Sequence, residues 1–154
     1  MLPLERCAKN ITLADLLAIE ARHHFVFPDA IRAFYLKHNG GYSPSNFFRR
    51  PEDDYPIGHF LPIRYGADHL EDTLQTFRDH PLLPQHFVPF SVDGGGDYYG
   101  FVTSPQEYGA IYLYSHEHYE EPNQGLIRIC SSFTELIENL VTEEQLTAQG
   151  GATP

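Results

Sequence analysis

The chain has 154 residues, enough for one domain around a single hydrophobic core and too few for two domains of ordinary size. Hydrophobic residues make up 42% and charged residues 20%, which is ordinary globular usage and excludes a wholly disordered chain. The formal net charge of -11 argues against nucleic acid and anionic membranes as partners, because both repel an acidic surface.

The negative charge gathers in the C-terminal part of the chain. Residues 1–92 carry eleven acids against nine lysines and arginines, whereas residues 93–154 carry ten acids against Arg128 alone. Such a distribution attracts a basic partner over long range. A solvated acidic surface that serves only solubility is the alternative.

The sequence gives no sign of a membrane segment, a disulfide framework or a nucleophile. No apolar run is long enough to cross a bilayer, and the first six residues lack the apolar stretch of a signal peptide, so we expect a cytoplasmic protein. Cys7 and Cys130 lie far apart without a second pair, which indicates reduced thiols rather than a disulfide or a zinc knuckle. A thiol in a buried strand, as expected for Cys130, is usually inert, and no G-x-S-x-G motif is present. We therefore expect no catalytic residue and no cofactor.

Two helices are predicted near the N-terminus. Thr12 can cap a helix over residues 13–22, whose first turn Asp15 favours. Pro28 opens a second helix, because proline is tolerated in a first turn. Its apolar face recurs at helical spacing, with Ile31, Phe34, Tyr35 and His38. The run Asn39-Gly40-Gly41 ends it, since Asn and Gly accept the left-handed conformation of a helix C-terminus.

The middle of the chain is less regular. Residues 47–48 favour a short strand, and residues 49–54 an exposed loop of mixed charge. Residues 60–65 predict a strand that Pro62 confines to an edge or a bulge. A short amphipathic helix follows over about residues 70–80.

The C-terminal part is mostly β. Four runs rich in β-branched and aromatic residues predict strands at 87–92, 98–102, 110–114 and 126–130, and their short connections favour an antiparallel meander. A capping-box pattern at Ser132 and Glu135 then opens a last helix. One face of that helix carries Leu136, Ile137, Leu140 and Val141. We expect a single domain over residues 1–145 and a flexible tail over 146–154.

Three segments follow one another in an order that resembles a known family. They are a helix with its stop at 34–41 (FYLKHNGG), a strand, glycine turn and strand at 88–99 (VPFSVDGGGDYY), and a last strand with its closing helix at 129–136 (ICSSFTEL). This ordered set resembles the SUKH superfamily, which includes the yeast Smi/Knr cell-wall regulators. The resemblance implies an α+β fold with a bent, mostly antiparallel sheet, flanked by N-terminal helices and a C-terminal helix.

The main role that the resemblance implies in bacteria is immunity. Such proteins bind and neutralise toxin domains, often nucleases, that contact-dependent or type VI secretion systems deliver. We expect a cognate toxin domain of basic charge as the partner, and a monomer or weak dimer. A regulatory scaffold that binds a host protein, as in the yeast relatives, is the alternative. A metal-dependent enzyme built on His116 and His118 is a third hypothesis, because two His at i and i+2 on a strand share a face.

Because the family has no universal functional residue, contact residues must come from chemistry. Acids can steer a basic partner and tyrosines can supply contact area. Since neighbouring strand residues alternate in direction, at most one of Tyr98 and Tyr99 points at the partner. The candidate contacts are Asp93, Asp97, Tyr98, Tyr99, Glu117, Tyr119, Glu120 and Glu121, with Glu52, Asp53 and Asp54 as a second acidic group.

The run from Asp93 to Asp97 encloses three glycines, Gly94, Gly95 and Gly96. Two carboxylates are too few for calcium, and a phosphate cradle would want a lysine and a following helix. The pattern favours a structural turn, in which glycines allow positive φ or close backbone approach. We assign the same structural role to the stop at Asn39, Gly40 and Gly41.

Overall fold

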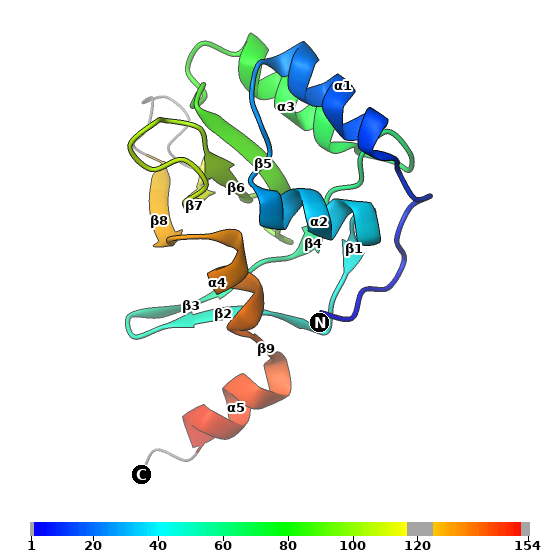
Figure 1. Ribbon diagram of the computed structural model, residues 1–154. Coiled ribbons are helices and arrows are strands. Elements are labelled where there is room, and N and C mark those ends of the chain that lie inside the picture. Colours follow the sequence, from blue (N-terminus) through cyan, green and yellow to red (C-terminus); the bar gives the residue numbers. More distant parts are fainter. Residues whose placement is uncertain (1, 117–124, 152–154) are drawn as a thin grey trace.

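The computed structural model describes residues 2–116 and 125–151 of the chain (Figure 1). Helices α1 (Leu13–His23) and α2 (Asp29–Lys37) precede strands β1 (Gly41–Tyr42), β2 (Ser45–Arg50), β3 (Asp53–Pro56) and β4 (His59–Phe60). Helix α3 (Leu70–Asp79) leads into strands β5 (Phe87–Val92), β6 (Tyr98–Val102), β7 (Ile111–Tyr114) and β8 (Leu126–Cys130). The chain continues through α4 (Phe133–Glu138), β9 (Leu140–Thr142) and α5 (Glu143–Gly151).

The strands form two sheets. The larger has the order β1-β4-β5-β6-β7-β8, and each neighbouring pair in it is antiparallel. The smaller has the order β3-β2-β9. Figure 1 shows α1 and α3 together at the top of the molecule, α2 and α4 in front of the large sheet, and the small sheet below them. The α+β class and the mostly antiparallel sheet expected from the sequence are confirmed. Among the described residues, no helix is long and apolar enough to cross a membrane.

The main hydrophobic core lies between one face of the large sheet and the helices. Leu16 of α1, Leu74 of α3 and Leu136 of α4 are fully buried in it. Tyr35 of α2 is also fully buried, and its hydroxyl donates to the backbone oxygens of Leu61 at 2.8 Å and Phe90 at 3.3 Å. A buried tyrosine hydroxyl needs such partners, so α2 is held to the sheet by packing and by hydrogen bonds.

Asn39 joins three separate parts of the chain, although it does not adopt the left-handed conformation that we expected. Helix α2 ends at Lys37, and only Gly40 and Gly41 of the Asn-Gly-Gly run have positive φ, at 75° and 117°. The fully buried Asn39 amide donates to the backbone oxygens of Lys9 and Ile63, at 2.7 and 2.8 Å. Its side-chain oxygen accepts from the Ile63 N–H at 2.7 Å. Asn39 therefore stabilises the fold through the hydrogen bonds of its side chain, and not through a left-handed backbone conformation.

The loop expected over residues 49–54 is instead a β-hairpin. Arg49 pairs in register with Asp54, and Arg50 with Asp53, so opposite charges face each other across the two strands. The buried ring of Phe48 anchors the hairpin, and Phe47 pairs with Val141 of β9. Charge pairing and long-range strand contacts account for the difference.

Three further expectations were wrong in part. The strand expected over 60–65 is limited to β4. The backbone N–H and oxygen of Ile63 form hydrogen bonds with the Asn39 side chain, so they are not available to pair with a neighbouring strand. Leu140 and Val141 belong to β9, which pairs with β2, and do not continue α4. The chain expected to form a tail from residue 146 is helical as far as Gly151, as part of α5.

We predict that Asn39→Asp lowers the free energy of unfolding by about 3 kcal/mol or more. The substitution keeps the shape and the acceptor oxygen but removes two buried donors and introduces a buried charge. Urea denaturation followed by circular dichroism measures the change. The exposed Asn10, changed to Asp, provides the matched control. A difference of less than about 0.5 kcal/mol between the two variants would contradict the role of Asn39.

We also predict that the two thiols differ in reactivity. Burial raises the pKa of the Cys130 thiol to about 11, and its Sγ contacts the Ser132 oxygen at 3.4 Å, whereas Cys7 is exposed. Because the thiolate is the reactive form, a disulfide reagent at pH 8 modifies one thiol of the native protein quickly and the second only on unfolding. Cys7→Ser removes the fast phase. Two equally fast thiols in the native protein contradict the burial of Cys130.

Candidate partner-binding face of the sheet

The two faces of the large sheet carry different tyrosines. Tyr99 is 1% exposed and belongs to the main core, so its neighbour Tyr98 points to the opposite face. Tyr98 pairs in register with Tyr114, and Gly100 pairs with Tyr112. Residues directly opposite in an antiparallel pair share a face. Tyr98, Tyr112 and Tyr114 therefore lie together on the face that points away from the main core.

A second aromatic cluster forms on this face. Phe77 of α3 packs edge-on against both Tyr98 and Tyr114, with ring centroids 5.4 and 5.5 Å apart. Phe87 lies beside them, 5.6 Å from Phe77. A Cβ atom on Gly100 would stand 2.7 Å from the Phe87 ring and 2.3 Å from the Val88 oxygen, so only glycine permits this close approach. The end of α3 is thus fixed to the tyrosines.

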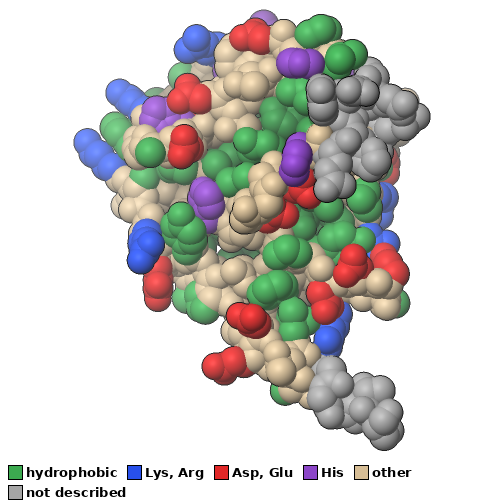
Figure 2. Space-filling view, turned by 180° about the vertical axis from the view of Figure 1, so that it is seen from behind, with side chains coloured by type: hydrophobic (Ala, Val, Ile, Leu, Met, Phe, Trp, Pro, Cys, Tyr) green, Lys and Arg blue, Asp and Glu red, His purple; other side chains and the backbone are tan. Residues whose placement is uncertain are grey.

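A groove of about 520 Å³ opens between α3 and the ends of β6 and β7. We call it the tyrosine groove. Its chemistry is set by Asp68, Asp72, Phe77, Tyr98, Tyr114 and His116. No lysine or arginine is among the described residues that line it. Figure 2, seen from behind Figure 1, shows histidine and acidic side chains among hydrophobic ones on this side of the molecule, with lysines and arginines toward the edges. The groove therefore combines aromatic surface with negative charge.

The hydroxyls of the three tyrosines are in different states. The Tyr112 hydroxyl donates to Glu107 at 2.6 Å. Burial, and then the negative charge of Asp68, raise the pKa of Tyr98, so its hydroxyl stays protonated. Tyr114 is 3% exposed, and burial raises its pKa as well. Its hydroxyl has no hydrogen-bond partner among the described residues. An unsatisfied buried hydroxyl costs about 1–3 kcal/mol, so Tyr114 carries an unused polar group beneath the surface of the groove that it lines.

Asp93 shapes the glycine turn. One oxygen of its carboxylate accepts from the backbone N–H of Gly95 at 2.8 Å and of Asp97 at 3.0 Å. Gly96 adopts φ of 90°, which closes the turn in a conformation that glycine accepts readily. A Cβ atom on Gly94 would have no other atom within 4 Å, so the turn has room for a side chain at this position. One oxygen of Asp93 is therefore committed to the fold.

Asp97 is also engaged within the chain. Its carboxylate lies 2.6 Å from Nδ1 of His116 and accepts from the His116 backbone N–H at 3.1 Å. This contact ties the turn between β5 and β6 to the end of β7. His118, the second histidine of the metal hypothesis, lies outside the described residues. Those residues contain no group of three His, Cys, Asp or Glu side chains placed to hold a metal.

The other candidate contacts fall in three places. Tyr99 is buried in the core, where burial raises its pKa, so it offers no surface to a partner. The β2–β3 hairpin carries Glu52 at its tip and Asp53 and Asp54 on its second strand. All three are exposed, and none of them lines the tyrosine groove. There Glu52 pairs with Arg50 at 2.7 Å and Asp54 with Arg49 at 3.3 Å. Four candidates, Glu117, Tyr119, Glu120 and Glu121, lie outside the described residues.

The sequence prediction missed Asp68, Asp72 and Tyr114. Alternation along residues 111–114 places Tyr112 and Tyr114 on one face, so this signal could have found the second tyrosine. Asp68 and Asp72 reach the groove because α3 packs beside the sheet. No local pattern reveals that packing.

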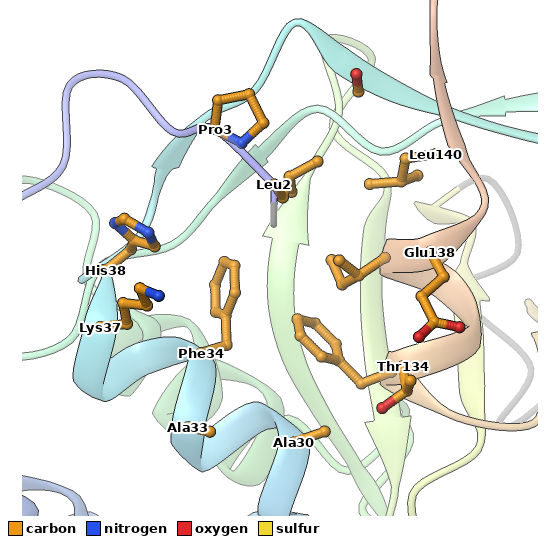
Figure 3. Close-up of a pocket in the computed structure, with 13 residues that line it drawn as sticks. Leu2, Pro3, Ala30, Ala33, Phe34, Lys37, His38, Thr134, Glu138 and Leu140 are labelled. Carbon is orange, nitrogen blue, oxygen red and sulfur yellow. The ribbon is translucent and has the colours of Figure 1, made fainter.

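A second groove, of about 600 Å³, lies between α2 and α4. Phe34 and Leu140 contribute apolar surface, and Leu2 of the N-terminal segment lies at one end (Figure 3). Lys37 and Glu138 lie on opposite sides of it (Figure 3). The charges in this groove are balanced, and it contains none of the candidate contacts. It is therefore a poorer match to a basic partner than the tyrosine groove.

Comparison with known proteins assigns the family. The pattern of the SMI1 / KNR4 family (SUKH-1) matches residues 10–139, which covers most of the chain from before α1 to the end of α4. The comparison with curated proteins finds none that matches. The three segments that suggested the SUKH superfamily all lie within the matched range, and the resemblance is confirmed. The chain belongs to the SMI1 / KNR4 family (SUKH-1).

Proposed function

We propose that this protein is an immunity protein, which binds a basic bacterial toxin domain in a tight one-to-one complex and carries out no chemistry of its own. The tyrosine groove is the observation that supports this most directly, because it joins aromatic surface to acidic side chains and none of the described residues that line it is a lysine or arginine. Membership of the family supports the same role. In this proposal the toxin is neutralised because the complex covers its active site or blocks its substrate path.

The chemistry of the groove suits a protein partner. Tyrosines supply large contact area at a low cost in side-chain entropy, and they are common among the residues that dominate binding energy. Acids around such a centre speed the encounter with a basic surface, while a polar rim adds little affinity. Tyr98 is the candidate for the central contact, since it is half-buried, packs against Phe77 and lines the groove together with Asp68 and Asp72.

We predict that the protein rescues the growth of cells in which its cognate toxin is induced. The first toxin to test is the product of the neighbouring reading frame, because toxin and immunity genes are usually adjacent in such systems. Tyr98→Ala should abolish rescue, while Leu36→Ala, which changes an exposed residue of α2, should leave it intact. If no toxin is neutralised while the protein co-purifies with a host regulatory protein, the scaffold hypothesis replaces this one.

We further predict that charge reversal at the groove slows association with the toxin. Asp68→Lys with Asp72→Lys should lower the association rate constant about 10-fold at low salt and reduce its dependence on ionic strength. Glu143→Lys with Glu144→Lys is the matched control, because these exposed acids of α5 give the same change in net charge away from the groove. Stopped-flow or surface-plasmon measurements report the rates. Equal rates for the two double variants would show that net charge, and not this groove, steers the partner.

A further inference from the structure

We propose that the tyrosine groove binds an arginine side chain of the partner, with the guanidinium held by Asp68 and Asp72 against the ring of Tyr98. This inference rests on the proposed function and adds to it the chemical group that the groove recognises. It identifies the partner by a protruding arginine, which the complex would bury at its centre.

The charges of the groove select a cation. Asp68 makes no ion pair with any other described residue. The side chain of Asp72 is 75% exposed, and its one ion pair among the described residues is with His69, at 3.2 Å. An anionic group in the groove would meet both carboxylates without a lysine or arginine in the described lining to offset them. A neutral apolar group would bury these carboxylates without a partner, which is unfavourable. Both acids can instead accept charge-assisted hydrogen bonds.

The rings of the groove favour a planar cation. Phe77 stands edge-on to Tyr98 and to Tyr114, at interplanar angles of 90° and 75°. Phe77 and Tyr114 are almost fully buried, so the half-buried Tyr98 is the ring of this cluster that an incoming group can contact. A guanidinium stacks on an aromatic face and donates in the plane of its fork at the same time. A lysine ammonium is a more strongly hydrated point charge and gains less from a flat surface. Arginine therefore fits the combination of rings and acids better than lysine.

The Tyr114 hydroxyl gives an independent reason to expect a ligand. Its side chain lines the groove, the residue is 3% exposed, and the hydroxyl has no partner among the described residues. The neighbouring Tyr112 hydroxyl, by contrast, is satisfied by Glu107. The Tyr114 oxygen has almost no exposed surface, so a guanidinium N–H reaches it only with a shift of the side chains around it. The contact would then supply the partner that the buried oxygen lacks.

The test titrates the protein with N-acetyl-arginine amide and follows the tyrosine ring signals by NMR, assigned through Tyr98→Phe and Tyr114→Phe. We expect saturable shifts at these two tyrosines with a dissociation constant on the order of 1 mM, as suits so small a ligand. N-acetyl-citrulline amide, which has the same shape without the charge, is the matched ligand control. It should bind at least about 10-fold more weakly.

Two variants test the residues. Asp68→Asn with Asp72→Asn should weaken arginine binding at least about 10-fold, while Glu143→Gln with Glu144→Gln should not change it. Tyr114→Phe should weaken binding about 3- to 10-fold and leave the melting temperature unchanged or raised, because the unsatisfied hydroxyl is removed without loss of packing. Equal shifts with arginine and citrulline, or arginine binding that survives the double Asn variant, would overturn the inference.

These outcomes are separate from those of the proposed function. If the protein rescues growth but does not bind the arginine amide, the immunity role is supported and the arginine inference is contradicted. If the protein binds the arginine amide at the groove but neutralises no toxin, the arginine inference is supported and the immunity role is contradicted.

Discussion

The buried Asn39 amide is the contact on which the position of the groove depends. It holds Lys9 of the N-terminal segment and Ile63 of the connection after β4 in one hydrogen-bonded group. The same connection carries the Pro62 oxygen, which accepts from the N–H of Leu70 at 2.7 Å where α3 begins. Helix α3 in turn supplies Phe77 and Asp72 to the groove. A side chain at the end of α2 thus sets the wall of a site on the other side of the sheet.

Strand β6 contributes to both the core and the groove, since its neighbouring tyrosines point in opposite directions. Tyr99 lies in the main core, and Tyr98 lines the groove. The part of the sequence that is richest in acids does not supply the acids that line the groove. Acids dominate residues 93–154, yet the turn acids Asp93 and Asp97 hold groups of their own chain. The acids that line the groove are Asp72, in the first turn of α3, and Asp68, just before that helix, in the part of the chain that is nearly neutral.

Local patterns predicted the elements that are formed by local interactions, and they failed where distant segments pair. The helical spacing of α2 and α3 and the meander from β5 to β8 could be read directly, because period and turn signals lie within each segment. Strand β9 could not, because Val141 is a strand residue only through its pairing with Phe47, far away in the sequence. Alternation predicted that Tyr98 and Tyr99 lie on opposite faces but not which of them is buried, and no local pattern placed Asp68 and Asp72 beside the sheet.

The Tyr114 hydroxyl shows how folding and binding compete at one position. Its ring packs against Phe77 and Phe87, and a phenylalanine ring would make the same contacts. The hydroxyl adds a buried polar atom that has no partner among the described residues, and an unpaired atom of this kind costs about 1–3 kcal/mol. Stability alone therefore favours phenylalanine at this position. A tyrosine is favoured when a group in the groove can use the oxygen. The two carboxylates that line the same groove favour an occupant that donates hydrogen bonds and carries positive charge.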